Sequence, residues 1–308
     1  MPACDNSDVL ARKQHIKYFQ RFLNLLPRRL SSYDSTRLTI AFFAISGLDI
    51  LNALDVLDEK KKRLIIDWIY RLQVVPDGSE PSWKRCGFQG SSTLIFPPDE
   101  TKCSPLYECG HLAMTYTGLA SLVILGDDLS RVYRAAIIEG VKALQQEDGS
   151  FCATLAGSES DMRFLYCAAC ICYILNDWSG MNIEKTMDYI VRSMSYDYGI
   201  AQAPELESHG GTTFCAVATL ALMNQLNTCF TNKQLDGLRR WGLARQISGF
   251  QGRPNKPVDT CYSFWLGAVL KLPSISGVLL LHLQAEEDLF LLMLGLSSLP
   301  SVPLVVCV

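Results

Sequence analysis

Four short turns of similar sequence decide the fold: CGFQG (86–90), DGSFCA (148–153), YGIAQ (198–202) and SGFQG (248–252). The apolar residue shared by the last three turns is Phe151, Ile200 and Phe250 in order, and it recurs at intervals of 49 and 50 residues. A fixed period of this length is the signature of a repeat architecture in which each unit stacks on its neighbours. We therefore expect a chain built from helical repeats.

Each turn precedes a segment of small and aromatic apolar residues. These segments are apolar on nearly all faces, so as helices they should be buried on both sides. The segments 129–149 and 181–195 have apolar residues at i, i+3, i+4 and i+7 and should form an outer layer. The expected buried helices are RLTIAFFAISGLDIL (37–51), GHLAMTYTGLASLVIL (110–125), DMRFLYCAACICYIL (161–175), GGTTFCAVATLALM (210–223) and DTCYSFWLGAVLKL (259–272).

Buried and amphipathic helices that alternate in this way predict an all-α fold, an α/α barrel (toroid) of repeated helical hairpins. An open α-solenoid shares the local pattern and differs only in whether the two ends meet. Strand-like alternation is scarce in the sequence, so an α/β fold is not expected.

Composition and charge exclude several classes of protein. The 308 residues are 49% hydrophobic and 19% charged, which suits a large core and not a disordered linker. The formal net charge of −3 lacks the basic excess of a nucleic-acid-binding protein. Residues 1–24 lack the apolar core of a secretory signal, so we expect a cytoplasmic protein without a stable membrane span. Cysteines such as Cys167, Cys170 and Cys172 should then be free thiols packed inside helices.

The repeat phase predicts a site. Residues at equivalent positions of successive inner helices should converge at one mouth of the barrel, and polar residues are unusual at the start of otherwise apolar helices. The polar and small residues in this phase are Asp161 and Arg163, His209 with Gly210 and Gly211, and Asp259 with Cys261.

Asp259 and Cys261 are candidate metal ligands. Pro257 should end any preceding helix, Asp259 stands at the expected N-cap, and Cys261 then lies in the first helical turn. A thiol there lies at the positive end of the helix dipole, which favours the thiolate that zinc binds. The alternative is an ordinary N-cap followed by a buried cysteine.

Cations gather in the same phase. Arg253 and Lys256 lie within four residues of each other, and Arg163 and His209 share their phase. Such a cluster suits an anionic ligand such as a diphosphate. The alternative is a solvated loop with incidental charges. Aromatic residues that would line an apolar cavity below, or simply form core, are Phe43, Tyr116, Tyr166, Phe264 and Trp265.

Five segments, 37–51, 110–132, 157–175, 207–215 and 252–265, resemble the beta subunit of protein geranylgeranyltransferase type I, a CaaX prenyltransferase. The resemblance extends from about residue 15 to about residue 272. It implies a barrel-shaped subunit that pairs with a helical prenyltransferase alpha subunit. It also implies transfer of a C20 group from geranylgeranyl diphosphate to the cysteine of a C-terminal CaaX motif, in proteins such as small GTPases.

The resemblance assigns roles to individual residues. Asp259 and Cys261 would bind one Zn²⁺ ion per beta subunit, and whether Mg²⁺ takes part is left open. Thr39 resembles the small residue that leaves room for the C20 chain, where farnesyltransferase carries a bulky Trp. The residues that would bind geranylgeranyl diphosphate, besides Thr39, are Arg163, His209, Gly210, Gly211, Arg253, Pro254, Asn255, Lys256, Tyr262, Ser263, Phe264 and Trp265.

The implied reaction is alkylation of a thiolate. Zinc would lower the pKa of the acceptor thiol, while the cations stabilise the charge that develops on the departing diphosphate. No general base of the protein is needed.

The resemblance ends near residue 272. We therefore divide the chain into a truncated barrel domain, 1–272, and a divergent apolar tail, 273–308, which contains no Lys or Arg. The family's third zinc ligand is a His of a later repeat, and His282 lies in no matching motif. We hypothesise an unclosed barrel with at most two of three zinc ligands. The alternative function is a non-catalytic form that binds the alpha subunit or prenyl diphosphate without turnover; a structural toroid without a ligand is a third hypothesis.

Overall fold

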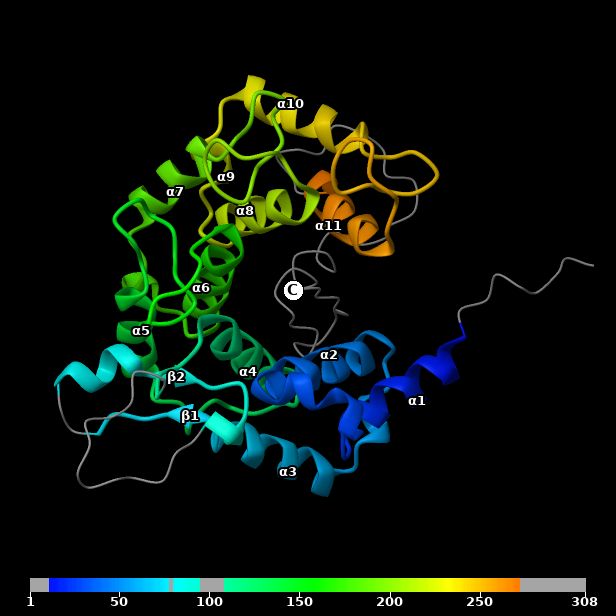
Figure 1. Cartoon of the computed structure of the whole chain (residues 1–308), viewed down its shortest axis with the longest axis vertical. Helices are drawn as coiled ribbons and strands as arrows, with labels where there is room; N and C mark the ends of the chain where they lie inside the picture. The colour runs from blue at the N-terminus through cyan, green and yellow to red at the C-terminus, as the bar shows by residue number, and fades with distance from the viewer. Residues whose placement is uncertain (1–10, 78–79, 95–107, 272–308) are drawn as a thin grey trace, which may run out of the picture.

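The protein is described from a computed structural model for residues 11–77, 80–94 and 108–271, whose helices form a curved arc in two layers, open between its first and last inner helices (Figure 1). The inner helices are α2 (Arg37–Ile50), α4 (Leu112–Ile124), α6 (Met162–Ile174), α8 (Gly210–Leu222) and α11 (Thr260–Lys271). The outer helices are α3 (Glu59–Tyr70), α5 (Arg134–Ala143), α7 (Ile183–Arg192) and α10 (Asn232–Leu243). The predicted all-α toroid of alternating helices is confirmed.

The remaining elements are short or peripheral. Helix α1 (Arg12–Phe22) packs outside α2, and α9 (Leu226–Cys229) follows α8. Strands β1 (Gln73–Val74) and β2 (Gly87–Phe88) pair antiparallel with Gln73 opposite Phe88. The 3-10 turns are η2 (Arg28–Thr36), η3 (Leu54–Val56), η4 (Glu80–Arg85), η5 (Ser92–Leu94) and η6 (Trp178–Gly180).

Burial separates the two layers as the sequence predicts. In α4 every residue except Val123 is buried, because α2 packs on one side and α6 on the other. In α7 only Thr186, Tyr189 and Ile190 are buried. Burying one large apolar side chain contributes roughly 1.5–3 kcal/mol, so the inner ring supplies most of the hydrophobic stabilisation.

Four inner helices begin with the same cap. The side chain that precedes the helix accepts a hydrogen bond from the backbone N–H two residues later, over 2.8 to 3.2 Å. This bond satisfies one of the amide groups left free at a helix start. The four caps follow the repeat at intervals of 50, 48 and 50 residues; they are His111, Asp161, His209 and Asp259.

The turns depend on glycine where two repeats touch. Gly149 has a φ of +94°, and a Cβ there would lie 2.2 Å from the carbonyl oxygen of Lys185. Both features exclude a larger side chain. The DGSF turn can therefore pack on the next outer helix only with glycine at this position.

One aromatic ring from each inner helix forms a continuous chain around the toroid. The ring centroids of Phe42 and Tyr116 are 5.7 Å apart, and those of Tyr116 and Tyr166 are 5.9 Å apart. Tyr166 contacts Phe214 at 5.5 Å, and Phe214 contacts Phe264 at 5.5 Å. Such tilted and edge-to-face pairs are favourable, so these rings link each inner helix to the next.

Three expectations of the sequence meet different outcomes. Cys167, Cys170 and Cys172 are free thiols buried inside α6, as predicted. No described helix is long and apolar enough to cross a bilayer. The tail 273–308, with His282, lies outside the described residues. The boundary at 272 and the unclosed barrel therefore stay predictions.

Candidate functional site

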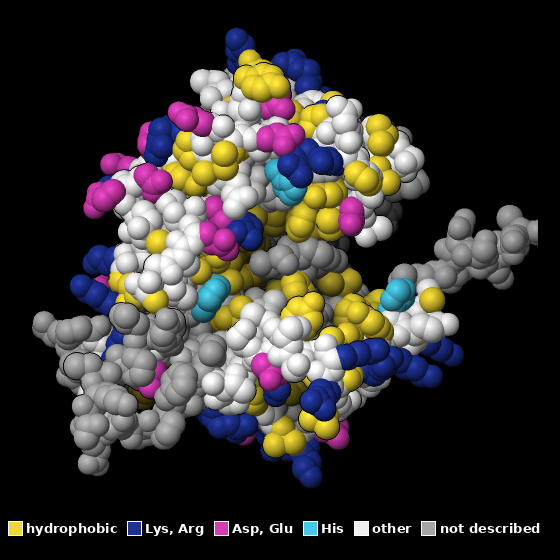
Figure 2. Space-filling view, in the orientation of Figure 1, with side chains coloured by type: hydrophobic (Ala, Val, Ile, Leu, Met, Phe, Trp, Pro, Cys, Tyr) yellow, Lys and Arg dark blue, Asp and Glu magenta, His cyan; other side chains and the backbone are white. Residues whose placement is uncertain are grey.

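A cavity of about 470 Å³ opens beside the starts of α6, α8 and α11. In the space-filling view, hydrophobic side chains gather around the central hollow and charged side chains lie on its rim (Figure 2). The cavity is lined by Arg163, Tyr166, Cys167, Gln202, Leu206, Glu207, His209, Gly211, Thr212, Cys215, Arg253 and Trp265.

Arg163 is held at the mouth by a buried carboxylate. Asp161 is only 2% exposed, and its Oδ2 lies 2.6 Å from Nη2 of Arg163. Gln202 donates from Nε2 to the same oxygen over 2.8 Å, and the exposed Glu159 adds a second ion pair to Arg163 at 3.2 Å. The hydrogen bond from Arg163 to Asp161 raises the pKa of the guanidinium. Arg163 is thus a fixed, charged donor.

His209 presents a neutral ring to the cavity. Burial, and then the charge of Arg253, lower its pKa. Its Nδ1 accepts the N–H of Gly211, so in the neutral ring the proton is on Nε2, which lies 3.1 Å from the hydroxyl of Tyr262. The rings of Tyr262 and Trp265 are 5.4 Å apart. His209 and Tyr262 therefore form one donor pair between α8 and α11.

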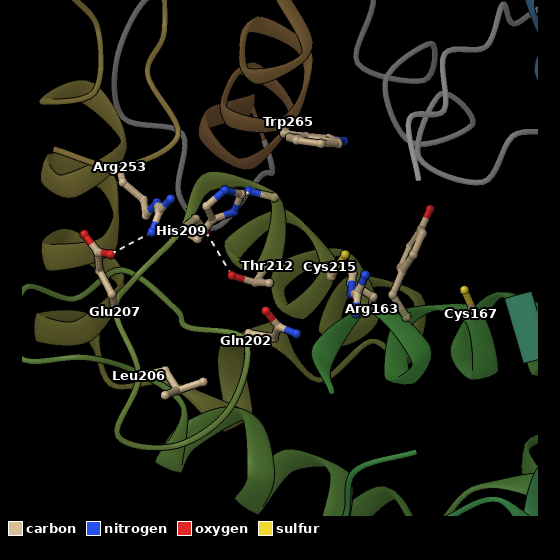
Figure 3. A pocket seen from close by; sticks show the side chains of 12 residues that line it. Arg163, Cys167, Gln202, Leu206, Glu207, His209, Thr212, Cys215, Arg253 and Trp265 are labelled. Carbon is tan, nitrogen blue, oxygen red and sulfur yellow. Dashed lines mark hydrogen bonds and ion pairs between the residues drawn. The ribbon is translucent and has the colours of Figure 1, made fainter. Parts of the chain in front are cut away.

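Arg253 reaches the cavity from the last turn. Its Nη1 lies 2.9 Å from Oε2 of Glu207, which belongs to the preceding turn of the repeat. Figure 3 shows this pair beside His209, with Arg163 on α6 further along the cavity. Two arginines and a histidine from three successive repeats thus converge, as the repeat phase predicts.

Asp259 and Cys261 have the expected local geometry. Asp259 is exposed, and its Oδ1 accepts the N–H of Cys261 over 2.9 Å, which lowers the pKa of the carboxyl. Cys261 is half-buried in the first turn of α11. A carboxylate and a thiolate can both bind zinc, but a protein zinc site takes at least three ligands from the protein. Within the described residues no third His, Cys, Asp or Glu completes the group.

Three residues proposed for prenyl diphosphate, Gly210, Phe264 and Thr39, are not among the residues that line this cavity. Gly210 backs onto Tyr262, where a Cβ would lie 3.1 Å from its ring. Phe264 packs on Phe214 in the aromatic chain. Thr39 lies on α2, where its hydroxyl is 3.2 Å from the sulfur of Met114.

Others lie on the rim. Lys256, Asn255 and Ser263 are exposed, and Pro254 lines a neighbouring hollow of about 520 Å³ with Glu207. Asn255 has a φ of +61°, in the left-handed region that Asn tolerates. The proposed contact of Lys256 with a diphosphate therefore stays a prediction.

Sequence reasoning missed Gln202, Glu207 and Thr212, and also the cap His111. Thr212 donates to the carbonyl oxygens of Ile200 and His209. The 50-residue phase could have found His111, which precedes Asp161 by one period. The same phase relates Glu207 to Glu159, since each stands two residues before a cap, whereas nothing in the sequence marks Gln202, whose partner Asp161 lies in another repeat.

Comparison with known proteins gives a consistent result. The family model described as "Prenyltransferase alpha-alpha toroid domain" matches residues 10–292. The chain is 42% identical over 272 residues to the geranylgeranyl transferase type-1 subunit beta of Arabidopsis thaliana, covering 85% of this chain and 72% of the relative. It is 40% identical over 282 residues to the protein of the same name from Dictyostelium discoideum, covering 88% and 78%.

More distant comparisons agree. The chain is 30% identical over 262 residues to the protein farnesyltransferase subunit beta of Schizosaccharomyces pombe, covering 83% of this chain and 60% of the relative. A solved structure of Candida albicans protein geranylgeranyltransferase-I complexed with GGPP is 24% identical, with a TM-score of 0.74 over 87% of this chain and 78% of that one. The structural match supports the toroidal fold.

Proposed function

The chain belongs to the prenyltransferase alpha-alpha toroid family, and on this premise we propose that it is the beta subunit of a protein geranylgeranyltransferase type I. It would transfer a geranylgeranyl group from geranylgeranyl diphosphate to the cysteine of C-terminal CaaX motifs. It would do so in the cytoplasm, paired with a prenyltransferase alpha subunit. The names of the two most identical relatives reported above support the assignment.

The observation that carries the proposal is an aromatic cavity with a cationic mouth. Arg163 and Arg253 at the mouth are suited to non-bridging phosphate oxygens, because a guanidinium offers paired donors. His209 donates from Nε2 to the hydroxyl of Tyr262, which leaves the O–H of Tyr262 as a neutral donor beside them. Below them Tyr166 and Trp265 present apolar faces to an isoprenoid chain. The mouth would stabilise the charge that grows on the departing diphosphate.

Zinc is part of the proposal at the level of the family. Asp259 and Cys261 would hold it, and when bound it would stabilise the acceptor cysteine as a thiolate at neutral pH. The described residues supply two ligands and not a complete set. We therefore derive no step through the metal, and assign to this chain only the binding of the diphosphate and the orientation of the prenyl chain.

Binding without turnover is the second candidate function, because the described residues hold two of the ligands that a zinc site needs. A transfer assay separates the two. The full chain, co-expressed with a prenyltransferase alpha subunit, is incubated with geranylgeranyl diphosphate and a CaaX peptide, with a Cys→Ser peptide as control. A mass increase of one geranylgeranyl group on the Cys peptide alone supports the enzyme. Saturable diphosphate binding without this product supports the binder, and the absence of both contradicts the proposal.

A further inference from the structure

Both arginines of the mouth are already paired with carboxylates, but the two pairings differ. Asp161, the partner of Arg163, is 2% exposed and also accepts from Gln202. Glu207, the partner of Arg253, is 57% exposed, and Arg253 is 40% exposed. The first carboxylate is enclosed by its neighbours, whereas the second lies in solvent at the edge of the cavity.

The position of Glu207 follows the repeat. Glu207 stands two residues before the cap His209, and Glu159 stands two residues before the cap Asp161 in the preceding repeat. Both glutamates pair with an arginine that lines the cavity. Two successive repeats thus place a carboxylate at the same phase, and each carboxylate pairs with an arginine of the cavity. We therefore treat the Glu207–Arg253 pair as a feature of the mouth and not as an isolated surface contact.

We propose that Glu207 is an internal counter-ion that competes with the diphosphate for Arg253 and thereby sets how tightly the cavity holds it. This inference rests on the proposed function. In the structure Glu207 accepts from Nη1 of Arg253. A diphosphate that binds this N–H takes it over from Glu207, and Glu207 then turns to solvent, to which more than half of its side chain is already open. When the product diphosphate leaves, Glu207 recovers Arg253.

The energies permit such an exchange. An exposed ion pair contributes little net stability, so Glu207 can be displaced by a ligand with more charge and several acceptor oxygens. Asp161 cannot be displaced in this way. If it released Arg163, its buried carboxylate would lose its cation, and the hydrogen bond from Gln202 would be lost if the side chain moved. Glu207 therefore opposes diphosphate binding and assists release, while Asp161 only positions Arg163.

The test is an equilibrium titration of the full chain, co-expressed with a prenyltransferase alpha subunit, with inorganic diphosphate and with geranylgeranyl diphosphate. Glu207→Gln removes the competing charge and keeps the size of the side chain. We expect both ligands to bind about two- to fivefold more tightly, the range that an exposed ion pair allows. The gain should shrink at high salt.

Two control variants assign the effect to the pair. Glu205 lies two residues from Glu207 and makes no ion pair with any described residue. Glu205→Gln therefore removes a nearby charge that does not pair with Arg253, and it should change the affinity less than Glu207→Gln. In an Arg253→Gln background the gain from Glu207→Gln should disappear, because Glu207 and the diphosphate then no longer compete for the guanidinium of Arg253.

The outcomes distinguish this inference from the proposed function. Tighter binding by Glu207→Gln that needs Arg253 supports it. If the unsubstituted chain binds both ligands and Glu207→Gln binds them equally or more weakly, Glu207 only ties two turns together and the inference is wrong. If the unsubstituted chain binds neither ligand, the proposed function is wrong as well.

Discussion

Asp161→Asn tests how the mouth of the cavity is built. Asparagine keeps a side-chain oxygen that can cap α6, since Asn and Asp are equally good N-caps, so the substitution keeps the cap while it removes the charge and the second acceptor oxygen. In the structure that charge accepts hydrogen bonds from the guanidinium of Arg163 and from Nε2 of Gln202, and it is 2% exposed. The matched control is Glu159→Gln, which removes an exposed charge from the same Arg163.

The magnitudes differ because burial differs. A hydrogen bond to a buried charged group contributes about 1.5–3 kcal/mol, whereas an exposed ion pair contributes about 0–1 kcal/mol. We expect Asp161→Asn to lower the free energy of unfolding by the larger amount and Glu159→Gln by the smaller. Because Arg163 loses its fixed position, Asp161→Asn should also weaken the binding of geranylgeranyl diphosphate.

Urea denaturation of the full chain, followed by circular dichroism, gives the free energies, and a binding titration gives the affinity. Equal losses of stability in the two variants would refute the reasoning, because the buried network would then contribute no more than the exposed pair. Unchanged affinity in Asp161→Asn would show that Arg163 does not need Asp161 to hold its position.

Three further predictions test other parts of the account. Thr39→Trp should fill space on α2 and lower kcat/KM for geranylgeranyl diphosphate relative to farnesyl diphosphate by about tenfold; an unchanged ratio would remove Thr39 from the site. Gly199→Ala would place a Cβ 2.4 Å from Trp241 and should lower the free energy of unfolding by about 1–3 kcal/mol. The control is Gly267→Ala on α11, where no described atom lies within 4 Å of the new Cβ, so the protein should not be destabilised. Thermal unfolding of both variants measures the difference. Burial raises the pKa of the Asp49 carboxyl from 3.8 to about 6. Its cost to folding is therefore absent below pH 3.8, where the folded and the unfolded chain both carry the proton, grows as the pH rises, and is complete above pH 6. Asp49→Asn should therefore raise the free energy of unfolding more at pH 7 than at pH 3, and an equal effect at both would contradict this.

The repeat made most of the fold predictable from sequence. Its period located the inner helices and placed Asp161, His209 and Asp259 at equivalent positions, although only Asp259 was expected as a cap. All three cap their helices because a helix start must satisfy its free amide groups wherever it recurs. His111 was missed because the interval from Phe88 to Phe151 is 63 residues, which hides the phase of the first repeat.

Two contacts that join neighbouring repeats at the mouth were beyond sequence reasoning. Glu207 meets Arg253 across 46 residues, and Gln202 meets Asp161 across 41. Both contacts arise only when neighbouring turns are stacked, and neither residue type is unusual in a turn. The sequence indicates which cations can gather at the mouth, whereas the structure shows what already occupies them.

The most direct test of the central claim is the structure of the full chain with its alpha subunit and geranylgeranyl diphosphate bound. The account predicts the diphosphate between Arg163, His209 and Arg253, with the isoprenoid chain passing Tyr166 and Trp265. A diphosphate bound away from these three side chains, or an isoprenoid outside the toroid, would contradict it.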